Sequence, residues 1–145
     1  MSALVRIVDA HWSRDEDRHA LVAIREAVFV VEQEVPVEIE LDAADPACRH
    51  LLAFAPDGRP IGTARMRDDG HIGRVAVVPE WRGRGVGAAL VEAMVERARE
   101  AGREVVDLDS QTQAIPFYEK LGFSSRGDVF TEAGILHQNM VRCLV

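Results

Sequence analysis

Cysteine is scarce in this chain, and long apolar runs are missing from it. Only two of the 145 residues are cysteines, Cys48 and Cys143, and neither stands in a Cys-x-x-Cys or Cys/His spacing. We therefore expect two free thiols in a reducing compartment, with a catalytic thiol as the alternative, and no metal site. No apolar run reaches the roughly 18 residues that a membrane helix needs. The first residues lack the pattern of a signal peptide, which predicts a cytoplasmic protein with no membrane partner.

Basic and aromatic residues are also few. The chain has 17 Lys and Arg against 24 Asp and Glu, a formal net charge of −7, and 6% aromatic residues. Because nucleic acid binding needs a basic face, this balance argues against a nucleic acid partner. The charge is uneven: residues 65–84 contain five arginines, whereas residues 32–45 contain six acids and no base. An anionic ligand would favour the first stretch and a cationic ligand the second, unless both are solvated surface.

The length suits one hydrophobic core. The chain of 145 residues is too short for two comfortable cores, and its 48% hydrophobic content is ordinary for a globular domain. We find no internal repeat, low-complexity tract or linker. The sequence thus predicts a single domain over residues 1–145.

The spacing of apolar residues predicts a helix and four strands in the first half. A capping box at Ser13 and Glu16 predicts the start of a helix that runs to about Val31. Its apolar face consists of Leu21, Ile24 and Val28. Two Asp-Gly pairs predict tight hairpin turns. The predicted strands cover residues 5–8, 50–55, 60–67 and 71–78, and residues 32–46 are predicted to form a loop.

The second half returns to helical spacing. A helix is predicted from Gly85 to Ala101, with an apolar face made of Val86, Leu90, Ala93, Met94 and Ala98. Further predicted elements are a strand at 104–109, a helix at 114–121, strands at 123–126 and 135–141, and a turn at 130–134. This order predicts an α/β (α+β) fold in which helices flank a mixed, mostly antiparallel central sheet.

A glycine-rich segment joins the third hairpin strand to the long helix. Its residues are Arg82, Gly83, Arg84, Gly85, Val86, Gly87 and Ala88. The first N–H groups of a helix have no internal partner, and the helix dipole places positive charge there. Without side chains in the way, these N–H groups can close on a phosphate, and the two arginines add forked donors. The segment therefore predicts a pyrophosphate site.

The glycine-rich segment has three other interpretations. A Walker loop would need Gly-Lys-Ser/Thr, which is not present. Gly83-x-Gly85-x-x-Ala88 fits a dinucleotide fingerprint, but four residues separate it from the strand, and the preceding strands are linked by hairpins. A glycine-rich turn without a ligand remains as the third alternative.

Two motifs resemble those of the GNAT family of N-acetyltransferases. The segment from Val75 to Leu90 contains Arg82-Gly83-Arg84-Gly85-Val86-Gly87, which resembles the family signature Arg/Gln-x-x-Gly-x-Gly/Ala. The segment from Phe117 to Phe123 is similar to the second family signature. Further matches at residues 29–33, 72–77 and 134–137 resemble the bacterial ElaA-like branch. The resemblance covers residues 6–141 and implies the GNAT fold with acetyl-coenzyme A as cosubstrate.

The resemblance also implies roles for individual residues. The strand at Val75, Ala76 and Val77 would carry a bulge, separate from the next strand, pair with the pantetheine arm and offer a backbone N–H to the acetyl carbonyl. Tyr118 matches the tyrosine that protonates the leaving thiolate. The family often has Asn at the position of Gln111, so this residue would contact either the cofactor or the acceptor.

The acceptor side is less defined by the sequence. A base or a water chain is needed to take a proton from the amine, and four residues are candidates for the base: Glu32, His50, Asp109 and His137. Arg25, Gln33 and Gln111 are further candidates for the acceptor cleft. The acidic stretch suggests a cationic amine. For each of these residues, simple packing or solvation is the alternative.

The predicted function is transfer of an acetyl group from acetyl-coenzyme A to a primary amine of a small molecule or peptide by direct attack. Two alternatives stay open: a module that binds or senses acyl-coenzyme A without turnover, and a transferase with another acyl donor or acceptor. If the chain assembles, a homodimer is the expected form.

Overall fold

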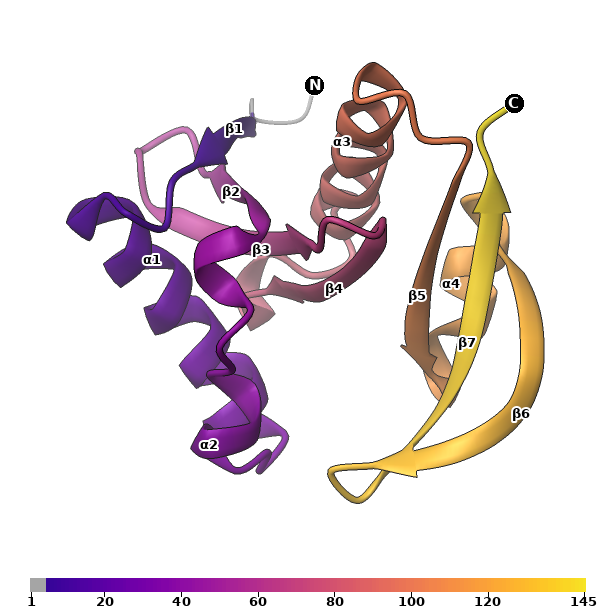
Figure 1. Cartoon of the computed structure of the whole chain (residues 1–145). Helices are drawn as coiled ribbons and strands as arrows, with labels where there is room; N and C mark the ends of the chain where they lie inside the picture. The colour runs from indigo at the N-terminus through magenta and orange to yellow at the C-terminus, as the bar shows by residue number, and fades with distance from the viewer. Residues whose placement is uncertain (1–4) are drawn as a thin grey trace.

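The computed structural model describes residues 5–145, which form one seven-stranded sheet with helices on its faces (Figure 1). The strand order is β1-β2-β3-β4-β5-β7-β6. The strands are β1 (Arg6–Ala10), β2 (Arg49–Phe54), β3 (Pro60–Met66), β4 (His71–Val77), β5 (Val105–Gln111), β6 (Ser124–Glu132) and β7 (Ile135–Cys143). The α-helices are α1 (Asp15–Arg25), α2 (Val37–Glu40), α3 (Val86–Glu100) and α4 (Ile115–Lys120). The other helical turns are the π-helix η1 (Glu26–Glu32) and the 3-10 turns Asp45–Ala47, Pro79–Trp81 and Thr112–Ala114. The predicted order of elements and the mixed, mostly antiparallel sheet are confirmed.

The sheet divides between β4 and β5. These two strands run parallel and are paired only at His71 with Asp107 and at Ile72 with Leu108. All other neighbouring strands are antiparallel. Beyond Ile72 the two strands separate, and Figure 1 shows β1–β4 and β5–β7 running in clearly different directions.

A bulge interrupts β4 just after this division. Thr63 pairs with Ala76 and Arg65 pairs with Gly73, so two residues of β4, Arg74 and Val75, lie opposite the single residue between Thr63 and Arg65. Arg74 has a φ of 51°, which is unusual for a residue with a side chain. The Thr63 hydroxyl donates a hydrogen bond of 2.8 Å to the Arg74 carbonyl. The bulge and the separation from the next strand, both implied by the family resemblance, are confirmed.

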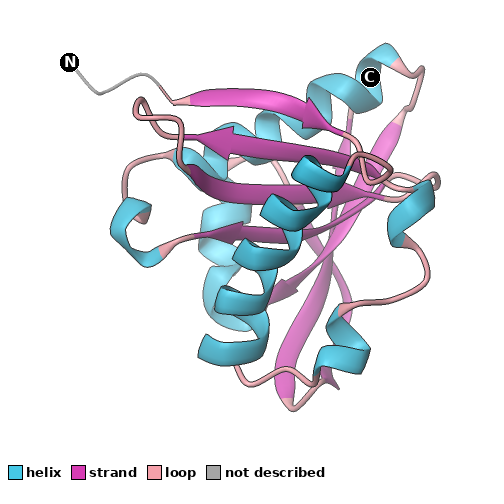
Figure 2. Cartoon of the chain, turned by 90° about the vertical axis from the view of Figure 1, so that its left-hand side faces the viewer, coloured by secondary structure: helices cyan, strands magenta, loops and turns pink. Residues whose placement is uncertain are grey.

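Two helices cover opposite faces of strands β1–β4 (Figure 2). The α3 residues Leu90 and Met94 are fully buried in the larger core. Leu21 and Ile24 of α1 are buried on the other face. Burying each such side chain stabilises the fold by about 1.5–3 kcal/mol. The helical faces predicted from apolar spacing therefore match the packing.

The structure corrects several predicted local features. Helix α1 begins at Asp15, and its N-cap residue Arg14 makes no side-chain cap hydrogen bond, so the predicted capping box at Ser13 and Glu16 is wrong. Asp17 instead accepts a 2.8 Å hydrogen bond from the N–H of His11 and so stabilises the preceding turn. The helical segment does run to about Val31, as predicted, but its second part is the π-helix η1 (Glu26–Glu32).

Two segments predicted as irregular contain regular structure. The predicted loop at 32–46 includes α2 and the 3-10 turn that begins at Asp45. The predicted turn at 130–134 is shorter, because β6 extends to Glu132 and only Ala133 and Gly134, both with positive φ, link β6 to β7.

Candidate active site

The glycine-rich segment presents bare backbone at the start of α3. Gly83 and Gly85 have φ values of 73° and 85°, and Gly85 is the N-cap residue without a side-chain cap. A methyl group at either glycine would meet nothing within 4 Å, so the segment faces open space. A Cβ at Gly87 would lie 3.5 Å from Phe117, which is ordinary contact. The first N–H groups of α3 are therefore accessible to an anion.

The two arginines of this segment are held in different ways. Arg82 donates from Nε to the Val77 carbonyl at 2.8 Å, and its terminal nitrogens form a bidentate pair with Glu32 at 2.6 and 2.7 Å. The guanidinium of Arg84 lies over the Trp81 ring, 4.6 Å from its centroid. Arg82 thus connects the glycine-rich segment to the end of η1, a contact that the sequence did not predict.

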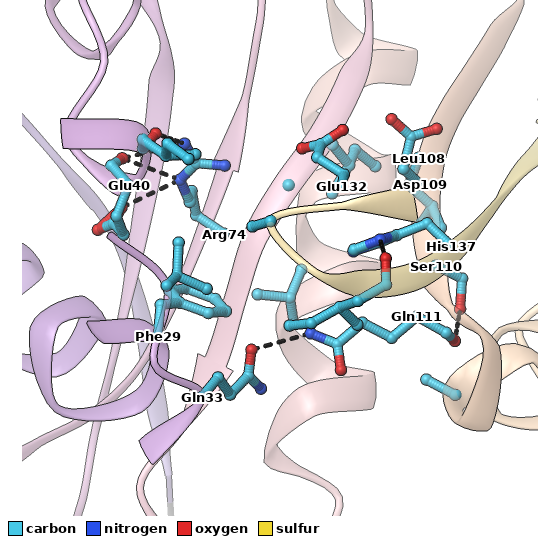
Figure 3. Close-up of a pocket in the computed structure, with 18 of the residues that line it drawn as sticks. Phe29, Gln33, Glu40, Arg74, Leu108, Asp109, Ser110, Gln111, Glu132 and His137 are labelled. Atoms are coloured by element: carbon cyan, nitrogen blue, oxygen red, sulfur yellow. Dashed lines mark hydrogen bonds and ion pairs between the residues drawn. The ribbon is translucent and has the colours of Figure 1, made fainter. Parts of the chain in front are cut away.

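A cavity of about 310 Å³ lies where β4 and β5 separate (Figure 3). It is bounded by these strands, by η1 and α2 on one side, and by the β6–β7 hairpin on the other. Among the residues predicted for the site, those that line the cavity are Gln33, Val75, Asp109, Gln111, Tyr118 and His137. The structure therefore brings one part of the proposed cofactor strand, the proposed acid and most of the proposed acceptor residues to one cavity.

Tyr118 lies on α4 between two aromatic rings. Its ring makes edge contacts with Phe117 and Phe123, with centroid distances of 4.9 and 5.9 Å. Burial raises the pKa of Tyr118 to about 12, because the phenolate would lose its hydration. The hydroxyl is therefore protonated at neutral pH and can act only as a donor to an anion.

His71 lines the cavity and lies beside two carboxylates. His71 Nδ1 lies 3.1 Å from Asp107 Oδ2, and His71 Nε2 lies 3.6 Å from Asp109 Oδ2. Asn139 donates to both carboxylates at 2.9 Å. His71 was not among the predicted bases. Its partners lie 36 and 38 residues away in the sequence and reach it only through the parallel pairing of β4 and β5.

Polar side chains also connect the two sides of the cavity. Gln111 Nε2 donates to Gln33 Oε1 at 2.9 Å, which joins β5 to the end of η1 (Figure 3). His137 Nδ1 lies 2.8 Å from the Ile135 carbonyl, and its ring stacks on Phe130. Gln111 thus faces the side predicted for the acceptor.

Three of the residues predicted for the acceptor side do not line the cavity. Arg25 is only 1% exposed and is bound by Glu40 and Asp45, so the expectation that it faces the acceptor is wrong. His50 is buried against Trp12, with Nε2 2.8 Å from the Asp45 carbonyl, and burial lowers its pKa. It does not line the cavity.

Glu32 also fails to line the cavity, because its carboxylate is held by Arg82. The hydrogen bond from Arg82 lowers the pKa of Glu32, which makes this carboxylate a weak base. Of the predicted bases, only Asp109 and His137 line the cavity.

The acidic stretch is largely neutralised. Glu40, Asp42 and Asp45 all pair with arginines, which are Arg25, Arg65 and Arg74. Because these three acids and Glu32 are already paired with arginines, they do not support the expectation that the acidic stretch attracts a cationic amine. Asp109 and Glu132 are the carboxylates that line the cavity without an arginine partner among the described residues.

The described part of the chain has no helix long and apolar enough to cross a membrane. Both cysteines are free, as predicted. Between residues 5 and 145, no group of three or more His, Cys, Asp or Glu side chains is arranged to hold a metal ion.

The divided sheet, the bulge in β4 and the bare start of α3 define an acyl-coenzyme A N-acyltransferase fold. The sequence model of the acetyltransferase (GNAT) domain matches residues 18–144, and the chain therefore belongs to the GNAT acetyltransferase family. The family resemblance found in the sequence is thus confirmed.

Relatives and solved structures agree with this assignment. YjcF of Bacillus subtilis, named as an uncharacterized N-acetyltransferase, is 37% identical over 82% of this chain and 87% of its own length. The structure of Escherichia coli ElaA has 32% identity and a TM-score of 0.84, covering 96% of this chain and 99% of its own. An acyl-CoA N-acyltransferase from Pseudomonas aeruginosa has 30% identity and a TM-score of 0.86, with the same coverage.

Proposed function

We propose that the chain transfers an acetyl group from acetyl-coenzyme A to a primary amine of a small molecule or peptide by direct attack. The observation that carries the proposal is the position of β4 between two features. Val75 lines the cavity, while two residues further on Val77 binds Arg82 of the glycine-rich segment. A ligand held at its phosphates by the start of α3 would thus lie along β4 and reach the cavity.

The residues present fit acetyl-coenzyme A. The N–H groups of Val86, Gly87 and Ala88 would bind the pyrophosphate, assisted by Arg82 and Arg84. The exposed backbone of residues 75–77 would pair with the pantetheine arm, and an N–H there would polarise the acyl carbonyl. When bound, acetyl-coenzyme A supplies the acyl group as an activated thioester.

We assign the proton-accepting role to His71. Because the Asp107 carboxylate only accepts hydrogen bonds, Nδ1 of neutral His71 carries the hydrogen and Nε2 keeps its lone pair. Nε2 can therefore take a proton from the amine. The Asp109 carboxylate, 3.6 Å from Nε2, stabilises the imidazolium that results.

Tyr118 supplies a proton at the leaving group. A simple thiol has a pKa of about 8.5, well below that of the buried phenol, so full proton transfer to the thiolate is uphill. The hydroxyl therefore acts first as a hydrogen-bond donor to the sulfur as charge develops there. The proton passes to the sulfur as the bond to the acyl carbon breaks, and the strongly basic phenolate takes a proton back from solvent, which makes the overall step downhill.

A cationic acceptor is favoured by the cavity rather than by the acidic stretch. Asp109 and Glu132 line the cavity, whereas Glu40 and Asp42 of the stretch are occupied by arginines. Two carboxylates in a partly enclosed site concentrate ammonium groups.

We further propose that residues 1–145 act as one cytoplasmic domain, and that any oligomer is a homodimer.

The release of free thiol from acetyl-coenzyme A in the presence of amines tests the function. We expect release with spermidine and other polyamines, falling as salt rises. Binding of coenzyme A in calorimetry without thiol release from any amine would favour the sensing module instead. Faster release from longer acyl donors would favour a different acyltransferase.

A further inference from the structure

One side of the cavity is attached to the sheet by charge instead of apolar packing. We call residues 35–45 the acceptor wall, because Val35, Ile39 and Glu40 line the cavity. Val37, Ile39 and Leu41 are 45%, 45% and 40% exposed. Among the described residues of the wall, the buried ones are Glu40 and Asp45, both charged. Apolar burial therefore contributes little to holding this segment in place.

Arginines from three elements hold the acceptor wall. Arg25 of α1 binds Glu40 at 2.8 Å and Asp45 at 2.9 Å. Arg65 of β3 binds Asp42 at 2.8 Å and Asp45 at 2.9 Å. Both guanidinium groups are buried, with side chains 1% and 5% exposed. These two arginines fix the base of the wall.

Arg74 is the third and has two roles at once. Its Nε donates to Glu40 Oε2 at 3.1 Å, and its Nη2 donates to the Glu40 carbonyl at 3.0 Å and to Asp42 Oδ2 at 3.3 Å. Its backbone forms the bulge in β4, with a φ of 51°. Glu40 and Arg74 face each other at one side of the cavity in Figure 3. The same residue thus shapes the strand next to Val75 and holds the wall opposite it.

We propose that Arg74 is a positioning residue that sets the distance between the acceptor wall and the bulge in β4. This proposal rests on the proposed function, because the bulge in β4 matters for the reaction only if the acyl carbonyl is polarised there. The Arg74 side chain governs acceptor binding and makes no contact needed for donor binding. Loss of this side chain loosens the wall and leaves the start of α3 unchanged.

Arg74→Gly separates the two roles, because glycine accepts a positive φ and keeps the bulge while the clamp on the wall is lost. We expect hydrogen exchange of the amides of Ile39, Glu40 and Leu41, which are hydrogen-bonded within α2, to accelerate at least about tenfold. With spermidine as acceptor, KM should rise about tenfold, while the dissociation constant for acetyl-coenzyme A stays within about twofold. Arg74→Lys keeps one charged donor and should restore part of the protection.

The matched control is Arg59→Ala, which breaks an exposed ion pair with Glu80 far from the wall and should change none of these quantities. Unchanged exchange of the amides of residues 39–41 in Arg74→Gly would overturn the proposal. A loss of acetyl-coenzyme A affinity as large as the rise in KM would also overturn it, since Arg74 would then shape the donor site. If the wild-type protein does not acetylate spermidine, the acceptor class fails, and the exchange measurement still decides the role of Arg74. Should Arg74→Gly not fold, the comparison of Arg74→Lys with the wild type carries the same test.

Discussion

Among single residues, Tyr118 has a hydroxyl group that burial keeps protonated and that we propose donates to the leaving sulfur. Its hydroxyl is kept neutral because the ring is enclosed by aromatic neighbours, which raises the pKa to about 12. A raised phenol pKa means that the proton is present throughout the physiological range. Ionisation of Tyr118 therefore does not limit the rate below about pH 11.

Tyr118→Phe keeps the ring and removes only the donor. We expect kcat to fall by about 10²-fold, the lower end of the usual contribution of an acid, with little change in acetyl-coenzyme A affinity. Thiol-release kinetics at pH 7 to 9 would measure this. A kcat within twofold of the wild type would assign protonation of the leaving group to solvent.

His71 gives a second prediction at this scale. His71→Gln retains a polar side chain beside Asp107 but has no group that takes a proton at neutral pH. The rate should fall by about 10²-fold or more, and acetyl-coenzyme A should bind as before. His19→Ala, at an exposed position on α1, is the control and should be fully active. If His71→Gln is active and His137→Gln is not, the base is His137.

The sequence predicts a role for Tyr118 because a local motif surrounds it, and it does not point to His71 because no local motif does. The carboxylate partners of His71 are set by strand register across the division of the sheet. Arg25 was misplaced for a related reason. A charged residue on the helix that precedes the acidic stretch can face a ligand or its own chain, and only the folded position of Glu40 and Asp45 decides between them.

Among the elements, α3 and its entrance were the most predictable. The apolar spacing of Leu90, Met94 and Ala98 matches their burial, and the alternating glycines match the open start of the helix. The π-helix η1 was not predictable, because its apolar residues also fit an ordinary helix. Its end brings Glu32 to Arg82, 50 residues further along the chain.

The contact between η1 and the glycine-rich segment leads to a prediction about donor binding. In Glu32→Gln, Arg82 loses the carboxylate that occupies its two terminal nitrogens. We expect acetyl-coenzyme A to bind up to about fivefold more tightly, since an exposed ion pair is worth at most about 1 kcal/mol. Calorimetry would measure the affinity, with the exposed neighbour Glu34→Gln as control. Weaker binding would instead show that Glu32 orients Arg82 for the ligand.

Gly87→Ala tests the start of α3 itself. The added methyl group lies at ordinary contact distance from Phe117, so the free protein should keep its stability within about 0.5 kcal/mol. Acetyl-coenzyme A should bind at least about tenfold more weakly, because the methyl group stands where a phosphate would approach the backbone. Thermal unfolding and calorimetry separate these two effects. Unchanged affinity would place the phosphates elsewhere.

For the whole molecule, stability depends on the ion pairs of the acceptor wall. Burial alone would raise the pKa of Asp42, but the hydrogen bond and charge of Arg65 outweigh it and lower this pKa from 3.8 to about 2. A carboxylate with a lowered pKa stabilises the fold fully above its unfolded value. This stabilisation, about 2 kcal/mol for Asp42, is lost as the pH falls from about 5 towards 2.

Asp42→Asn should therefore flatten the dependence of stability on pH. We expect the variant to be less stable than the wild type at pH 6 by about 2 kcal/mol and nearly equal to it at pH 2. Urea unfolding at several pH values would measure the difference. Asp128→Asn, at an exposed position on β6, should run parallel to the wild type. A constant difference at all pH values would mean that the Asp42 carboxylate is not coupled to Arg65.

Only two residue pairs join β4 to β5, so the sheet consists of two halves that are connected over a short stretch. The half made of β1–β4 carries the bulge and leads into the glycine-rich segment, and the half made of β5–β7 carries Asp109, Tyr118 and the β6–β7 hairpin. Where β4 and β5 separate, their unpaired backbone groups can form hydrogen bonds with a ligand that lies between the two strands. Such a ligand would take the place of a missing strand. Occupancy would then stiffen the protein as a cross-link does, and resistance to proteolysis would rise together with ligand concentration.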